Sequence, residues 1–304
     1  MGCAGGGSSA PPVEDKIPAV KFDKTRAWDH LTRQVAFGPR VPGTTAHSNC
    51  RDYLLAEFKK HTDNARLQEF KHTWSQDNRQ YTMWNIIGEQ NWQNATTRVT
   101  LYAHWDSRPT ADQEFDEEKR AQPVPGANDG ASGVAVLLEL MRSLKEQNPK
   151  VGIQYVLTDG EDLGPFINEM LLGAAHFAKN PPDPKPDYGI LLDMIGDKDL
   201  RVPMERNSYR YAPKLMDALY AHAKAVGLSK TFPAVPGETI VDDHMPLNEV
   251  GMPTIDLIDF TYEPWHTLED TPDKCSPDSL LKVGALLETW LLKETPFKPA
   301  GKAR

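Results

Sequence analysis

The stretch at residues 125–162, PGANDGASGVAVLLELMRSLKEQNPKVGIQYVLTDGED, decides the fold class. Its middle part places Leu137, Leu140, Met141 and Leu144 at the i, i+3, i+4, i+7 spacing of a helix with one buried stripe. The run VGIQYVLT that follows is apolar over the length of a strand and ends in acidic residues. A helix followed by a near-continuous apolar strand is typical of a parallel sheet that helices cover on both faces.

The same alternation extends outward from this stretch. Strand-like runs occupy residues 65–73, 81–90, 97–106, 187–197 and 251–260, and helical patterns occupy residues 24–35, 46–61, 168–180, 213–227 and 276–294. No shift in composition divides residues 21–300, so we expect one domain. The predicted fold class is therefore α/β, with a largely parallel sheet between helices.

Composition narrows the class of partner. The 304 residues have a formal charge of −9 and contain no block of lysine or arginine, which argues against nucleic acid or an anionic membrane as partner. With 39% hydrophobic side chains, the chain can bury a sizeable core. No apolar run approaches the roughly 20 residues that a membrane-spanning helix needs.

The first residues, MGCAGGGSSAPPVEDK, are rich in Gly, Ser and Pro, so we expect residues 1–20 to be a flexible tether. Cys3 stands where a bacterial lipoprotein has its acyl anchor once the signal peptide is removed. A cloning remnant or an ordinary tail cysteine is the other interpretation. Cys50 and Cys275 lie far apart in the sequence and predict no disulfide framework.

Acids and histidines follow the apolar strands on their C-terminal side, the edge at which open α/β sheets bind ligands. The residues expected to converge there are His104, Asp129, Glu161, Asp162, Asp193, Asp242 and His266. Two imidazoles among carboxylates, without a thiolate, suit zinc. A single aspartate after a strand is more often a helix cap, so the prediction depends on this convergence.

The segment IVDDHMPL at residues 240–247 places Asp242, Asp243 and His244 between apolar flanks. Adjacent carboxylates there are tolerable if a metal ion or shared protons neutralise them. We expect His244 to support Asp243 without binding metal. The other histidines are interpreted as structural, in helices (His176, His222) or at the surface or on helix faces (His30, His47, His61, His72).

Six motifs, in order AHWDS, GANDGASG, DGEDLG, LLDMIG, VDDHMPL and EPWHT, resemble those of the zinc aminopeptidase superfamily and, more closely, of its glutaminyl cyclase branch of bacterial type. The resemblance covers roughly residues 30 to 295. It implies a single three-layer domain of the zinc-exopeptidase type, with a central twisted mixed sheet flanked by helices on both faces. Residues 21–300 would be this catalytic domain.

The resemblance also implies the roles of the site residues. One zinc ion per chain would be bound by Asp129, Asp162 and His266, and Glu161 would be the general acid/base. Asp242 and Trp265 favour a cyclase, because related aminopeptidases typically have one aspartate in place of the Asp-Asp-His segment and a tyrosine before the ligand histidine.

The reaction expected from the resemblance is conversion of an N-terminal glutamine to pyroglutamate with release of ammonia. Zinc would polarise the side-chain amide carbonyl as the substrate's own α-amine attacks it. Asp193 and Asp242, hydrogen-bonded to Glu161 and to each other, would raise the proton affinity of Glu161. The residues expected to form apolar walls are Trp265 and Ile240, with Phe260, Tyr262 and Phe166 as further candidates.

The chain departs from animal cyclases at three positions, which are Asp162, Ala103 and Val134. Asp162 replaces a glutamate, and Ala103 and Val134 occupy the places of a cysteine pair. His104 is retained, so a second metal bridged by Asp129 and bound by His104 and Asp193 stays open. Asp106 would then be a further ligand or a support.

Two alternatives accompany the cyclase interpretation. One is a co-catalytic two-zinc aminopeptidase, and the other is an inactive metal-bound binding module. The expected partners are peptides or proteins with N-terminal glutamine, the expected state is a monomer, and no nucleic acid is expected. Because such enzymes meet free peptide N-termini in secretory compartments, we expect a periplasmic or cell-envelope bacterial enzyme, with Cys3 as a candidate lipid anchor.

Overall fold

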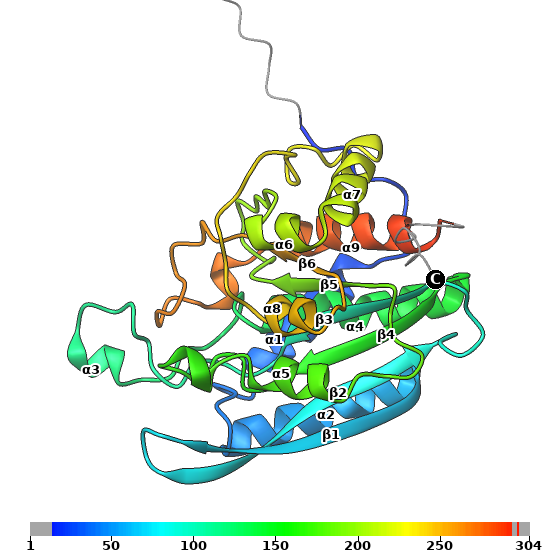
Figure 1. Cartoon of the computed structure of the whole chain (residues 1–304). Coiled ribbons are helices and arrows are strands. Elements are labelled where there is room, and N and C mark those ends of the chain that lie inside the picture. The colour runs from blue at the N-terminus through cyan, green and yellow to red at the C-terminus, as the bar shows by residue number, and fades with distance from the viewer. Residues whose placement is uncertain (1–13, 294–296, 298–304) are drawn as a thin grey trace, which may run out of the picture.

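The computed structural model describes residues 14–293 and Phe297 (Figure 1). One six-stranded sheet has the strand order β1-β2-β4-β3-β5-β6. The strands are β1 (Asp63–Trp74), β2 (Arg79–Gln90), β3 (Arg98–His104), β4 (Gly152–Thr158), β5 (Tyr188–Asp193) and β6 (Thr254–Ile258).

The sheet is mixed, with a parallel majority. β1 pairs with β2, and β2 with β4, in antiparallel fashion, whereas β4, β3, β5 and β6 are mutually parallel. The four parallel strands are buried along nearly their whole length. The predicted, mostly parallel sheet is confirmed. The register pairs His104 with Thr158, so β3 and β4 end level with each other.

Helices lie on both faces of the sheet, and side chains alternate between two cores. Leu101 and Ala103 of β3 belong to the larger core, whereas Tyr102 between them belongs to the smaller one. Figure 1 shows α5 and α8 on the viewer's side of the strands and α4 behind them. The helices are α1 (Lys24–Val35), α2 (Thr45–His61), α3 (Glu117–Arg120), α4 (Ala131–Gln147), α5 (Leu172–Lys179), α6 (Arg206–Tyr211), α7 (Pro213–Ala225), α8 (His244–Glu249) and α9 (Pro277–Leu291).

The close approach of α4 to β5 sets the distance between the segments that bear Asp129 and Asp193. Gly130 precedes the helix with φ +93°, a conformation that L side chains rarely adopt. A Cβ atom on Gly133 would collide with the backbone carbonyl of Leu192. Small residues at the start of α4 therefore let the helix pack directly on the sheet.

Two predicted elements are shorter than the sequence indicates, and left-handed residues explain both. Leu171 has φ +56°, so the helix expected from residue 168 starts at Leu172 and a short 3₁₀ turn (Ile167–Glu169) precedes it. Met194 has φ +46°, which ends β5 at Asp193. The carboxylate of Asp193 is therefore at the edge of the sheet.

Part of the expected tether is packed against the domain. Asp15 accepts hydrogen bonds from the backbone N–H groups of Lys230 and Thr231, and the N–H of Lys16 donates to Gly227. Residues 14–20 thus differ from the expectation, whereas residues 1–13, including Cys3, lie outside the described residues. Within the described part of the chain, no helix is long and apolar enough to cross a membrane.

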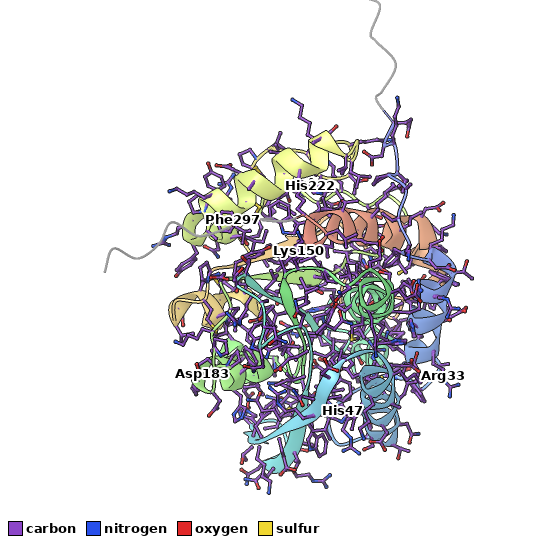
Figure 2. The ribbon with its side chains drawn as sticks, turned by 90° about the vertical axis from the view of Figure 1, so that its right-hand side faces the viewer. Arg33, His47, Lys150, Asp183, His222 and Phe297 are labelled. Atoms are coloured by element: carbon purple, nitrogen blue, oxygen red, sulfur yellow. The ribbon has the colours of Figure 1, made fainter. Side chains whose placement is uncertain are left out.

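His47 lies on a face of α2, as one of its two interpretations had it, and not at the surface (Figure 2). It is fully buried, its ring stacks on Trp105, and its Nε2 atom lies 2.9 Å from Asp159 Oδ1. His222 on α7 has the structural role that was expected, since it bonds Thr289 and contacts Trp290.

The packing of α4 on β5 predicts that Gly133→Ala lowers the free energy of unfolding by about 1–3 kcal/mol, because the added methyl group has no space beside Leu192. Urea unfolding measures the change. Lys145→Ala, on the exposed side of the same helix, is the control and should change it little. Equal stabilities of Gly133→Ala and the parent chain would contradict this account of the contact.

Candidate active site and metal centre

A cavity of about 60 Å³ lies at the carboxyl edge of the parallel strands. Eight of the ten residues predicted for the site line it: Asp129, Glu161, Asp162, Asp193, Ile240, Asp242, Trp265 and His266. His104 and Asp106 lie behind it, in contact with these acids. A larger cavity of about 630 Å³ beside α7 has a mainly apolar lining without histidine, so we place the chemistry in the smaller one.

Asp129, Asp162 and His266 form a group that fits a metal ion. Their ligand atoms all lie within 4.8 Å of one another. His266 Nε2 is 3.4 Å from Asp162 Oδ1 and 3.6 Å from Asp129 Oδ2. At bond lengths of about 2.0–2.2 Å, the ligand atoms of a tetrahedral zinc ion lie roughly 3.3–3.6 Å apart. The donor set and its spacing therefore suit zinc.

The orientation of His266 depends on a residue that sequence reasoning missed. Asp112 Oδ1 lies 3.0 Å from His266 Nδ1 and leaves Nε2 directed at Asp129 and Asp162. A carboxylate on the far ring nitrogen is the usual outer partner of a metal-binding histidine. Asp112 lies in a loop of irregular structure, where no periodic signal marks it.

Arg108, which sequence reasoning also missed, links the metal-ligand candidate Asp162 to Asp112. Its guanidinium donates to Asp162 at 2.6 Å and to Asp112 at 2.6 Å. Burial opposes the charged form of Asp162, but the positive charges of His266 and Arg108 lower the pKa of Asp162 to about 2. Asp162 is therefore ionised and ready to bind a cation at neutral pH.

Glu161 is the acid with the proton affinity that base chemistry requires. Burial and the neighbouring charge of Asp162 raise its pKa well above the ordinary value. Its backbone N–H donates to Asp106 Oδ1 and that of Asp162 to Oδ2, so Asp106 fixes the turn after β4. Asp106 thus supports the site.

Asp193 and Asp242 line the cavity together with Glu161. Asp242 acts through its charge, which helps to raise the pKa of Glu161. Burial, followed by the charges of Asp193 and Asp243, raises the pKa of Asp242 itself. Burial and charge repulsion therefore favour a proton on these acids, and the hydrogen bonds expected between them stay a prediction.

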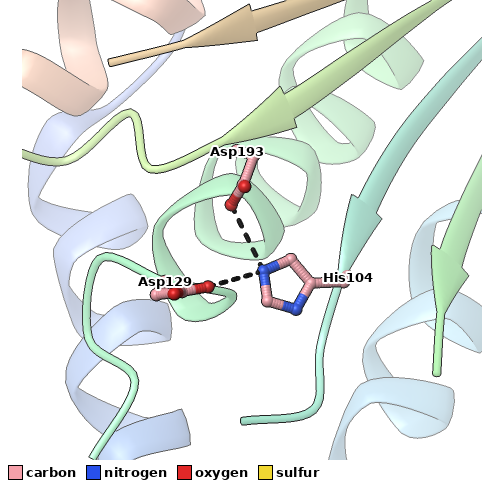
Figure 3. Close-up of side chains that lie close together, drawn as sticks. All are labelled: His104, Asp129 and Asp193. Carbon is pink, nitrogen blue, oxygen red and sulfur yellow. Dashed lines mark hydrogen bonds and ion pairs between the residues drawn. The ribbon is translucent and has the colours of Figure 1, made fainter. Parts of the chain in front are cut away.

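His104 forms a second group with Asp129 and Asp193 (Figure 3). Its Nε2 lies 3.0 Å from Asp129 Oδ1 and 3.2 Å from Asp193 Oδ1. Burial disfavours the imidazolium, but the charge of Asp193 and hydrogen bonds donated to the neighbouring carboxylates raise the pKa of His104 well above its usual value. Because Asp129 belongs to both groups, it could bridge two metal ions. Without a second metal ion, it could instead accept a hydrogen bond from protonated His104.

The apolar wall forms around Trp265. Its ring stacks on that of His266, with 3.9 Å between the ring centroids, and packs on that of Phe260, with 5.0 Å between the centroids. Phe260 lines the cavity together with Ile240. Two further candidates do not line it. Tyr262 is buried with its hydroxyl donating to Asp270, and Phe166 is 56% exposed.

Asp270 and Asp243 position the turns that frame the cavity. Asp270, which the sequence did not single out, accepts hydrogen bonds from the N–H groups of Asn128 and Asp129. Asp243 accepts one from the Thr158 hydroxyl at the end of β4. This contact ties the loop that contains Asp243 to the end of β4.

Comparison with known proteins places these features in a family. Residues 85–291 match peptidase family M28. A glutaminyl-peptide cyclotransferase-like protein of Mus musculus is 25% identical over 91% of this chain and 77% of its own. Solved structures of a Bacteroides thetaiotaomicron glutaminyl cyclase and of a leucine aminopeptidase precursor from that organism are each 33% identical. The cyclase has a TM-score of 0.86 and covers 92% of this chain, and the aminopeptidase precursor has a TM-score of 0.85 and covers 93%. Both are matched over their whole length.

The contact between Asp112 and His266 predicts that Asp112→Ala weakens zinc binding by about 10- to 100-fold, because the ring loses the partner that orients it. Competition with a chromophoric chelator measures the affinity. Asp116→Ala, at an exposed cap of α3, is the matched control and should leave it unchanged. An unaltered zinc affinity in Asp112→Ala would show that the contact does not orient the ligand.

Proposed function

Because the chain belongs to peptidase family M28 and to its glutaminyl cyclase branch, we propose that it is a zinc-dependent glutaminyl-peptide cyclotransferase. It would convert the N-terminal glutamine of peptides or proteins to pyroglutamate and release ammonia. The proposed catalytic cofactor is one zinc ion in the reaction cavity of each chain, bound by Asp129, Asp162 and His266.

One observation supports the cyclase assignment most strongly. Asp242 lines the cavity beside Glu161 and Asp193, yet it belongs to neither of the two groups that contain Asp129. The cavity therefore contains more buried acid than metal binding there requires. Glu161 belongs to none of the three groups of candidate metal ligands, so it is available for holding and moving a proton, which cyclisation needs at two nitrogen atoms in turn.

The residues of the chain suggest the following sequence of steps. When bound, zinc supplies a Lewis acid for the side-chain amide carbonyl of the substrate. Glu161 accepts a proton from the α-amine as its nitrogen forms a bond to the side-chain carbonyl carbon. It returns this proton to the side-chain nitrogen, whose bond to carbon then breaks, and ammonia leaves. Burial and the charge of Asp162 keep the pKa of Glu161 raised, which favours its role in both transfers.

The small size of the cavity contributes through proximity. Trp265 and Ile240 would hold the glutaminyl side chain folded against its own amine, so no second reactant has to be bound. The same walls exclude bulk water, which limits competing hydrolysis of the side-chain amide.

The cellular setting is part of the proposal. We infer a monomeric, periplasmic or cell-envelope bacterial enzyme, with Cys3 as the candidate point of lipid attachment. This inference is supported by the position of Cys3 in the sequence and by the free N-termini that such an enzyme must meet.

A two-metal aminopeptidase is the second candidate. The observation that favours it is the group of His104, Asp129 and Asp193, which shares Asp129 with the first group. In that reaction Glu161 would activate a water molecule for attack on the first peptide bond. The two candidates differ in which bond of the same substrate breaks.

A glutaminyl arylamide distinguishes these candidates in one incubation. The proposed cyclase forms the pyroglutamyl arylamide and one equivalent of ammonia, because the anilide bond is not the one that breaks. Mass spectrometry and an ammonia assay measure both products. Release of the free arylamine as the main product would identify a peptidase instead.

Glu161→Gln should lower kcat by about 10²- to 10⁴-fold while the protein keeps its zinc, because glutamine cannot accept the proton. The parent enzyme should lose rate as the pH falls through the raised pKa of Glu161, since only the carboxylate is a base. Glu263→Gln, at an exposed acid two residues before Trp265 that does not line the cavity, is the control. Full turnover by zinc-loaded Glu161→Gln would remove Glu161 from the mechanism.

A further inference from the structure

A third group of residues whose side chains could bind a metal ion consists of Asp242, His244 and Asp256. Asp242 lines the reaction cavity, whereas His244 and Asp256 do not. Their ligand atoms lie within 4.8 Å of one another, and all three residues are at least 96% buried, with exposed fractions of 4%, 0% and 0%. Asp242 belongs to the loop before α8, His244 begins α8, and Asp256 lies in the middle of β6. None of the three belongs to the groups that contain Asp129.

Five of the six polar side-chain atoms of this group lack hydrogen-bond partners. Both carboxylate oxygens of Asp256, both ring nitrogens of His244 and the Oδ2 atom of Asp242 have none. Most buried polar side-chain atoms in proteins have at least one partner, and a bound ion or water is a usual reason for an exception. His244 Nε2 faces Glu205 at 3.4 Å. The other four atoms, gathered in one place, therefore point to an occupant between them.

Protons alone do not complete this arrangement. A proton on Asp256 would add a donor to a carboxyl group whose two oxygens already lack partners. A charged His244 would still lie 3.9 Å from Asp256 Oδ2 through its Nδ1 atom, which is too long for a hydrogen bond. After burial, the largest influences that raise the pKa of Asp256 are the negative charges of Asp242, Asp193, Glu205 and Asp243. A positive charge is what the group lacks.

We propose that Asp242, His244 and Asp256 bind a second divalent cation of the zinc class. The imidazole in the donor set favours such a transition metal over sodium, magnesium or calcium. The separation of 3.9 Å between His244 Nδ1 and Asp256 Oδ2 closes to the roughly 3.3–3.6 Å of a tetrahedral site with a shift of a few tenths of an ångström. Water can complete the coordination.

Glu205 supplies the outer contact that such a histidine needs. The Nε2 atom of His244 lies 3.4 Å from Glu205 Oε2, on the opposite side of the ring from Asp256. Glu205 is itself held by the backbone N–H groups of Asn207, Ser208 and Ile240. A fixed carboxylate on one ring nitrogen directs the lone pair of the other nitrogen toward the cation.

The bound cation would have a structural task that does not depend on the proposed cyclase reaction. It would tie the loop that contains Asp242 to β6 and offset negative charge behind the cavity. Asp242 would then present one oxygen to the cation while its side chain keeps its place in the cavity lining. The site is thus independent of whether the enzyme proves to be a cyclase or a peptidase.

Anomalous diffraction from crystals of the full chain grown with zinc tests the proposal directly. Data on the two sides of the zinc absorption edge should show a peak between Asp242, His244 and Asp256, separate from any peak at Asp129. Peaks at Asp129 alone, with water or no density at the third group, would overturn the proposal. The location of the peak distinguishes this site from the one at His104.

Metal content in solution gives a second readout. Asp256→Asn should contain one zinc equivalent fewer per chain than the parent protein after zinc loading and gel filtration, as measured by plasma mass spectrometry. Asp259→Asn is the matched control, because Asp259 is an equally buried carboxylate just after β6, held by the N–H groups of Arg201 and Thr261. It should keep the full content. Equal zinc in folded Asp256→Asn and parent would overturn the proposal, and near-UV circular dichroism verifies the fold.

Discussion

Buried negative charge at the carboxyl edge of β4, β3, β5 and β6 is the constraint on which the rest of the structure depends. Asp129, Asp162, Asp193 and Asp242 are almost completely buried within one small space. Isolated carboxylates in such surroundings would be strongly destabilising, so each must be paired, protonated or bound to a cation. His104, His266 and Arg108 supply part of the required positive charge, and the geometry around His266 suits a metal ion for the rest.

The way in which this charge is shared separates the roles of neighbouring residues. Asp162 and Glu161 are adjacent in the chain, yet the guanidinium of Arg108 and the ring of His266 lower the pKa of Asp162, whereas burial and like charge raise that of Glu161. One acid is thereby suited to binding a cation and the other to binding a proton. The turn that presents them in these different surroundings is fixed by Asp106, which accepts hydrogen bonds from both backbone N–H groups.

Hydrophobic pattern and strand ends could be predicted from the sequence because they follow from periodicity. The helix expected at residues 24–35 is α1, and the acids expected at the carboxyl edge meet in one cavity. Arg108, Asp112 and Asp270 could not be predicted, since they lie in irregular loops and act only through contacts made on folding. Tyr262 was misjudged for a similar reason: an aromatic residue near a ligand can face either the cavity or the core, and only its bond to Asp270 decides.

The central claim is that one cavity unites a zinc ion with a base for cyclisation. A crystal structure of the zinc-loaded protein with a non-cyclising N-terminal glutamine analogue tests it most directly. The account predicts zinc between Asp129, Asp162 and His266, the side-chain amide of the analogue in the cavity beside it, and the α-amine within hydrogen-bond distance of Glu161. An analogue whose amine lies away from Glu161, or zinc bound without His266, would contradict it.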